Sequence, residues 1–180
     1  MSRAGIEQLL YVVDMAFDAH GYEDSLLRNL RSVPEDAWLW MPAGGNRNVR
    51  MIAGHVGACK YMYRDHAFGD GTMTWNDDAG GLGVSIEEMQ STSRLGAQEP
   101  SVGAIIEWLC EGHRLFRDSV AALDDAELTG LRRPPEGGMQ ETRWITAVLS
   151  NHDLYHAGEI NHIRALRHGD DRWAWQGEGR

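Results

Sequence analysis

Four stretches of apolar residues with helical spacing constrain the fold more than any other feature of this sequence. Side chains three or four positions apart share one face of a helix, and this repeat runs through residues 4–31, 48–68, 101–123 and 142–167. No stretch of two-residue alternation, which would indicate a half-buried strand, competes with them. A long helix with one apolar face has to bury that face against other helices. The pattern therefore predicts an all-α protein built as a four-helix bundle.

Capping residues and glycines indicate where these helices begin and end. Asn48 is a preferred N-cap directly before the second apolar stretch, and Gly169 follows the fourth. Gly21 lies inside the first stretch, where we expect a bend. Ser85 and Glu88 have the spacing of a capping box, which predicts a short extra helix before the third long helix. The connections are longer than tight turns, so spacing alone leaves both parallel and antiparallel neighbours open.

The charge balance limits the partners that the chain can have. Its 180 residues carry 27 acidic against 17 basic side chains, a formal net charge of -10 at pH 7, whereas nucleic acids and anionic membranes attract basic surfaces. No apolar run is long enough to cross a bilayer, the first residues lack a signal-peptide core, and 2 cysteines cannot form a disulfide framework. We therefore expect a cytoplasmic protein with a single domain over residues 1–180. We expect it to act on a small molecule and to bind neither nucleic acid nor membrane.

Two histidines on the fourth stretch suggest the chemistry. His152 and His156 are four residues apart, so they project from one face of the helix, and the apolar stripe of Ile145, Leu149 and Ile160 continues through both. Two imidazoles in an apolar interior cannot both be protonated without repulsion and desolvation. Neutral imidazoles, however, are natural ligands for a divalent metal. The pattern indicates a metal site, and the alternative is a pair of ordinary buried histidines.

A third ligand has to come from another helix. His55 is the leading candidate because it borders the apolar face of the second stretch, and His113 competes because it lies on the inner face of the third. Glu159 follows His156 by three residues, and it could bind the metal directly or orient a ligating histidine. The remaining histidines, which we expect to be solvated or near helix ends, are His20, His66, His162 and His168.

A cysteine and several tryptophans allow more than one interpretation. Cys59 lies one turn after His55 and could be a fourth ligand or a reactive thiol, although a small buried hydrophobic residue is the more common role. Trp144 opens the fourth helix, where we expect it in the core or at a dimer contact. The tryptophans beside loops or near the C-terminus, expected to be partly buried at an interface or to stack on a ligand, are Trp38, Trp40, Trp173 and Trp175.

The segment HDLYHAGEI, from His152 to Ile160, resembles the last-helix signature of the DinB-like (YfiT-like) metalloenzyme superfamily, which usually reads H-x-x-Y-H-x-G-Q-I. The helix order, the place of His55 in the second helix and the chain length also agree with that family. The resemblance implies an up-down-down-up bundle, usually homodimeric, that binds a divalent metal, commonly nickel or zinc. By the same resemblance the ligands are His55, His152 and His156. Glu159 stands where the family usually has glutamine, which brings an additional carboxyl group to the site.

Three histidine ligands leave at least one coordination position open, which is typical of catalytic metal sites. Relatives of this kind resemble thiol S-transferases and isomerases that use bacillithiol, mycothiol or glutathione. We therefore expect an enzyme that presents a low-molecular-weight thiol to a small electrophilic substrate. The alternatives are a metal-dependent hydrolase, with Glu159 as the nearest general base, and a non-catalytic homodimeric module that binds a metal or a small ligand. Because ligating imidazoles must be unprotonated, we expect the metal to be lost below about pH 6.

Overall fold

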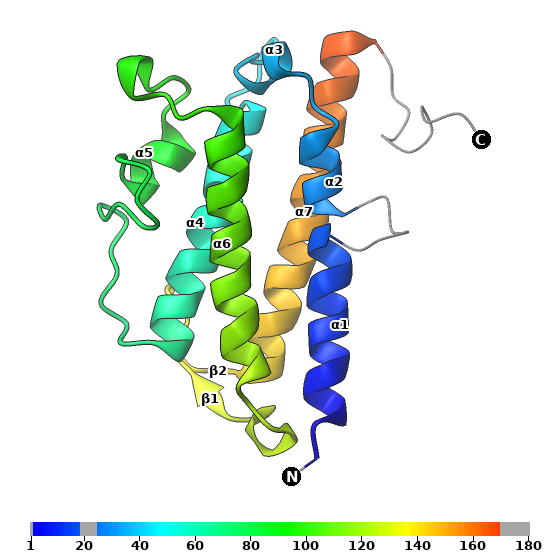
Figure 1. Cartoon of the computed structure of the whole chain (residues 1–180), viewed down its shortest axis with the longest axis vertical. Coiled ribbons are helices and arrows are strands. Elements are labelled where there is room, and N and C mark those ends of the chain that lie inside the picture. The colour runs from blue at the N-terminus through cyan, green and yellow to red at the C-terminus, as the bar shows by residue number, and fades with distance from the viewer. Residues whose placement is uncertain (1, 19–24, 170–180) are drawn as a thin grey trace, which may run out of the picture.

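Four long helices form a bundle, as the apolar pattern predicts, and they run up-down-down-up, as the family resemblance implies (Figure 1). A computed structural model describes residues 2–18 and 25–169, and in Figure 1 the first and last long helices run upward while the two between them run downward. The four helices are α1 (Ala4–Asp18), α4 (Val49–Phe68), α6 (Val102–Ala121) and α7 (Thr142–His168). None of the helices in the described ranges is long and apolar enough to cross a membrane.

Shorter elements fill the connections. They are α2 (Leu26–Arg31), α3 (Glu35–Trp38), α5 (Ile86–Ser91), the 3-10 turns Gly96–Gln98 and Asp125–Glu127, and the strands β1 (Leu131–Arg132) and β2 (Gln140–Glu141). The two strands pair antiparallel, with Leu131 opposite Glu141. Neither these strands nor α3 was expected from the sequence. The predicted short helix before the third long helix is α5, and Ser85 and Glu88 form both hydrogen bonds of its capping box.

The first apolar stretch contains two helices instead of the one predicted over residues 4–31. Ser25 has an extended backbone and is the N-cap of α2, so a new helix begins at Leu26. A residue with extended backbone angles cannot continue the hydrogen-bond ladder of a helix, and the single-helix prediction is wrong at this position. The bend predicted at Gly21 lies outside the described residues.

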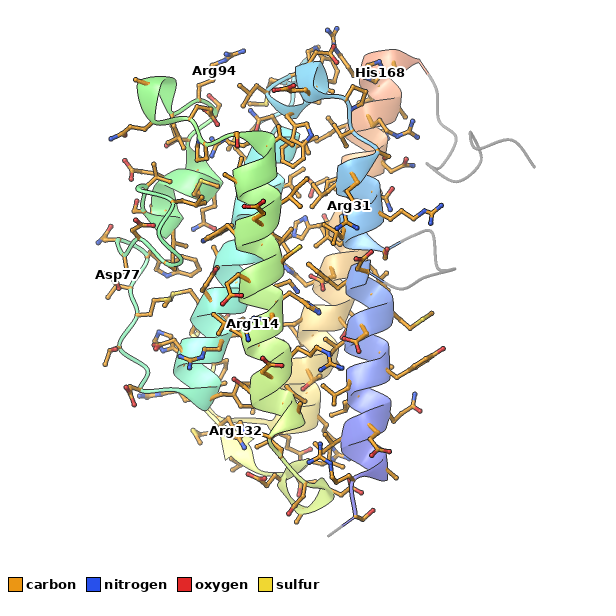
Figure 2. All side chains as sticks on the ribbon, in the orientation of Figure 1. Arg31, Asp77, Arg94, Arg114, Arg132 and His168 are labelled. Carbon is orange, nitrogen blue, oxygen red and sulfur yellow. The ribbon has the colours of Figure 1, made fainter. Side chains whose placement is uncertain are left out.

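The apolar faces of the helices form two neighbouring core clusters. Trp38, Ile52 and Trp108 belong to one cluster, and Phe116 and Ile145 belong to the other. In the bundle, α4 packs against both α6 and α7, and α1 packs against the same two helices. Charged side chains such as those of Arg31 and Arg94 point away from the bundle (Figure 2). The long helices α4 and α7 are therefore held in place by a shared core.

A buried ion pair connects α4 to α7. The Nζ atom of Lys60 lies 2.8 Å from Oδ2 of Asp153, and both side chains are 2% exposed. The ammonium group also lies 5.0 Å from the centroid of the Phe17 ring. A charge that leaves water at this depth needs an opposite charge, so each partner requires the other. Because Asp153 directly follows His152, the ion pair also fixes the helical position from which that imidazole projects.

The long connection between α4 and α6 brings α5 unusually close to α4. A Cβ atom on Gly54 would meet the carbonyl oxygen of Met89 at 2.4 Å, so only glycine allows this approach. The buried side chain of Arg50 donates to the same carbonyl oxygen at 2.8 Å. Glycine at position 54 thus lets α5 lie directly beside the turn of α4 that carries His55.

Candidate metal centre

Three imidazole rings meet between α4 and α7. The Nε2 atom of His152 lies 3.0 Å from Nε2 of His55 and 3.1 Å from Nε2 of His156. Within the described residues, these three side chains each offer one nitrogen, and the nitrogens all lie within 4.8 Å of one another. The structure thus brings together the three histidines selected from the sequence, and we call them the histidine cluster.

Gln90 of α5 determines which nitrogen of His55 faces the cluster. The Oε1 atom of Gln90 lies 3.0 Å from Nδ1 of His55, and its Nε2 donates to Oε2 of Glu87 at 2.9 Å. An ionised carboxylate only accepts hydrogen bonds, so the amide nitrogen has to face Glu87 and the amide oxygen has to face His55. Nδ1 of His55 therefore carries the proton and donates it to Gln90, which leaves a lone pair on Nε2, directed into the cluster.

Glu159 makes the corresponding contact with His156. Its Oε2 atom lies 2.8 Å from Nδ1 of His156, one turn earlier on α7. The carboxylate accepts the proton of Nδ1, so Nε2 of His156 also presents a lone pair. A side chain that orients a ligating histidine makes this same hydrogen bond, which was one of the two roles expected for Glu159.

His152 lies between the other two rings and cannot donate a hydrogen bond to both of them. Its Nδ1 is buried and has no hydrogen-bond partner in the described part of the chain. A proton on its Nε2 could be donated to His55 or to His156, but not to both at once. At least one pair of nitrogens about 3 Å apart is therefore a pair of acceptors facing each other.

A divalent metal ion fits this arrangement by donor type and by spacing. A metal–nitrogen bond of about 2.0–2.1 Å, with an angle of about 90–109° at the metal, separates two ligand nitrogens by about 2.9–3.4 Å. The observed separations of 3.0 and 3.1 Å fall within that range. A cation shared by the nitrogens would also replace the repulsion between facing lone pairs with attraction.

Burial keeps two rings of the cluster neutral. Together with the smaller effects of the neighbouring histidines and of the cation of Arg47, burial lowers the pKa of both His152 and His156 to about 3. Both rings are thus neutral over the physiological range. Neutral imidazole is the form that binds a metal, so the surroundings prepare these side chains for that role.

His113, the competing candidate for the third ligand, lies elsewhere in the bundle. Its ring stacks on Phe17 of α1 with 3.7 Å between centroids, and its Nε2 lies 4.0 Å from Oδ1 of Asp14. Burial lowers the pKa of His113 to about 4. The side chain is therefore a neutral core residue at the contact between α6 and α1.

Cys59 lies beside the histidine cluster but outside it. Its Sγ atom is 3.9 Å from Nε2 of His55, yet the described group of ligand atoms within 4.8 Å of one another does not include it. Burial raises the pKa of the thiol to about 12, so it stays protonated and unreactive at neutral pH. Cys59 is thus a small, partly buried residue that packs against the second core cluster.

None of the described tryptophans and none of the remaining described histidines belongs to the histidine cluster. Trp38 is a core residue at 2% exposure, and its indole N–H donates to the carbonyl of Val33. The prediction that it lies at an interface or stacks on a ligand is therefore wrong. The ring of Trp144 is 43% exposed, which excludes the core role considered for it. Trp40 is partly buried against the core, His66 is half-buried in the last turn of α4, and His162 and His168 are exposed. The residues that lie outside the described ranges are His20, Trp173 and Trp175.

Sequence reasoning missed the side chains that α5 and the segment before α4 bring to the cluster. Gln90 and Glu87 are three residues apart on α5, and this spacing does indicate a shared face. No pattern in the sequence, however, relates that face to His55, because the contact depends on how the long connection folds back onto α4. Arg47 lies immediately before the N-cap of α4 and approaches the cluster only in three dimensions.

The fold and the cluster together define a helical-bundle protein with three histidines that could hold a metal ion. Comparison with known families gives the same result from the sequence. The family model described as the DinB superfamily matches residues 21–160, a range that includes His55, His152 and His156. The chain belongs to the DinB superfamily. No curated relative matched the sequence.

Proposed function

We propose that His55, His152 and His156 bind one divalent cation, nickel or zinc, and that the chain is a metal-dependent enzyme. One observation carries this proposal: the Nε2 atom of His152 lies within 3.1 Å of two nitrogens that both present lone pairs. Gln90 and Glu159 hold the opposite nitrogens of those rings as donors, so proton rearrangement cannot relieve the conflict. The arrangement has the features of a site built around a cation.

We further propose that the enzyme uses a low-molecular-weight thiol to attack a small electrophilic substrate, as an S-transferase or isomerase. A cation bound at three imidazoles supplies Lewis acidity at its open positions, which lowers the pKa of a thiol or water there. The chain contributes neutral ligands, so the full positive charge of the cation is retained. The cluster also lies beside a cavity on α4 and α5, which gives a ligand a place to lie next to His55.

The carboxylates beside the cluster favour thiol chemistry over hydrolysis. Hydrolysis needs a base that can take a proton from water, and Glu159 was the nearest candidate. Its Oε2 atom accepts from His156, and Oε2 of Glu87 accepts from Gln90. Both carboxylates thus orient other side chains. Attack by a metal-bound thiol would not need either of them as a general base.

A turnover assay on the metal-loaded protein tests the proposal. The wild-type chain should couple a thiol such as glutathione to 1-chloro-2,4-dinitrobenzene faster than His55→Ala, with chloride as the leaving group. His66→Ala is the matched control, because His66 lies on the same helix and hydrogen-bonds outside the cluster to the carbonyl of Met73. Equal rates for wild type and His55→Ala would favour the non-catalytic binding module, and cleavage of an ester substrate without thiol would favour the hydrolase.

A homodimer remains a proposal from the family resemblance. Trp144 of α7 is 43% exposed and can contact a second copy of the chain. Sedimentation equilibrium of the wild type and of Trp144→Arg tests this. A dimer that the variant weakens is the expected result, and a wild-type monomer would contradict it.

A further inference from the structure

A cavity of about 330 Å³ opens directly beside the histidine cluster. It lies between the beginning of α4 and the face of α5, and His55 forms part of its wall. Met51 provides an apolar surface, while Arg47, Glu87 and Gln90 provide polar ones. A ligand that reaches the cluster through this cavity must therefore lie against both an apolar wall and a charged one.

Arg47 brings an uncompensated positive charge to this cavity. In the ranges that the structure describes, its guanidinium group makes no hydrogen bond and no ion pair, whereas Arg114 pairs with Glu111 and Asp118 on the surface of α6. Arg47 and His55 line the same cavity. The cation of Arg47 therefore lies on the cavity that opens beside the histidine cluster.

The nearby carboxylate does not neutralise Arg47. Glu87 lines the same cavity, but its Oε2 accepts from the amide of Gln90, and no ion pair joins it to Arg47 among the described residues. The whole chain carries a formal net charge of -10, so its surface in general repels anions. A free arginine beside the candidate metal site makes this cavity a local exception.

We propose that the cavity binds a thiol that carries a carboxylate group, with the carboxylate paired to Arg47 and the sulfur directed toward the histidine cluster. This inference rests on the proposed function and narrows the class of thiol. A planar guanidinium group can hold a carboxylate through two parallel hydrogen bonds, which gives orientation as well as affinity. Orientation matters here because the sulfur has to reach the cation while the rest of the molecule lies along the apolar wall.

Cobalt(II)-loaded protein and two matched thiols test the inference. Binding of 3-mercaptopropionate and of the uncharged 3-mercaptopropan-1-ol is followed by the sulfur-to-cobalt absorption band, and metal content is measured in parallel. The wild type should prefer the charged thiol by about fivefold, as for a strong half-exposed ion pair, and the preference should shrink with added salt. Arg47→Gln should bind both thiols equally with full metal content, and Arg47→Lys should keep part of the preference.

Arg133→Gln is the control, because Arg133 is also exposed and lines a separate cavity, near the C-terminal end of α4. It should keep the wild-type preference. Equal affinity of the wild type for both thiols, or an unchanged preference in Arg47→Gln, would overturn the inference and leave the proposed function standing. If the protein binds cobalt but neither thiol changes the spectrum, the proposed thiol chemistry is wrong and the inference is overturned with it.

Discussion

The side-chain oxygen of Gln90 lies 3.0 Å from Nδ1 of His55, which links the long α4–α6 connection to the histidine cluster. The contact depends on Gly54, where the absence of a Cβ atom allows α5 to approach α4. The orientation of a candidate metal ligand is thus determined by a helix that supplies no ligand itself.

Gln90→Met should weaken metal binding about tenfold, because it removes the acceptor that orients His55 while keeping a side chain of similar length. Competition with a chromophoric chelator measures the affinity. Gln8→Met, an exposed substitution on α1, serves as the control and should bind metal like the wild type. Unchanged affinity in Gln90→Met would show that this hydrogen bond does not support the site.

Each of His55→Ala, His152→Ala and His156→Ala should lose the bound metal, whereas His162→Ala, an exposed change on α7, should retain it. Elemental analysis of freshly purified protein gives the stoichiometry, which should be one ion per chain in the wild type. A ligand that binds only the folded state at 100 times its Kd adds about 2.7 kcal/mol to the free energy of unfolding. The wild type should therefore melt at a higher temperature with metal, and the three variants should not.

Lys60→Met should lower the free energy of unfolding by about 3–5 kcal/mol, because it leaves the carboxyl group of Asp153 buried without its partner. The double variant Lys60→Met/Asp153→Leu should recover most of that loss, since it removes both buried charges. Urea denaturation of the metal-free proteins measures both effects. A double variant that is less stable than the single one would contradict this account of the ion pair.

The metal-free protein should become less stable as the pH falls from about 6.5 to about 4, in part because of His113. Burial lowers the pKa of this imidazole to about 4 in the folded state, while the unfolded chain takes up the proton near pH 6.5. Protonation therefore favours the unfolded state in this window, and the contribution is on the order of 3 kcal/mol. Urea midpoints against pH should fall less steeply for His113→Gln than for the wild type, and His168→Gln, an exposed control, should follow the wild type.

Gly54→Ala should destabilise the fold by about 1–3 kcal/mol, because the new Cβ atom would meet the carbonyl oxygen of Met89 at 2.4 Å. Gly103→Ala is the matched change in the first turn of α6, where the nearest atom is 3.9 Å away. That control should be neutral or stabilising, since alanine favours a helix by roughly 1 kcal/mol over glycine. Thermal denaturation distinguishes the two, and equal melting temperatures would mean that α5 adjusts without cost.

The long helices were predictable because each carries its own periodic apolar face, and some of their ends carry recognisable caps. Asn48 accepts from the backbone of Met51 at the start of α4, as its position in the sequence suggests, and Gly169 ends α7 in a left-handed conformation. The directions of the helices could not be predicted from the apolar pattern, because long connections allow several topologies. Only the family resemblance indicated up-down-down-up. The break at Ser25 was missed because the apolar stripe continues on both sides of it.

The histidine cluster could be found from spacing plus resemblance, whereas its surroundings could not. His152 and His156 share a helix face by local geometry, but the contact of Gln90 with His55 and the place of His113 on Phe17 depend on tertiary packing. The pH at which the metal should dissociate also depends on tertiary packing, because burial changes the pKa of the ligating histidines. Free histidine suggests about pH 6, yet burial lowers the pKa of His152 and His156 to about 3, so protons should displace the metal only in more acidic solution.

The polar side chains of the cavity wall and the candidate ligands come from different elements, although His55 belongs to both. Two long helices carry the three imidazoles, while Arg47, Glu87 and Gln90 lie on the segment before α4 and on the short helix α5. Substitutions at these polar positions can therefore change which compound the cavity accepts and leave the histidine cluster intact. Within a lineage that accumulates such substitutions, chemistry would be inherited and selectivity would diverge.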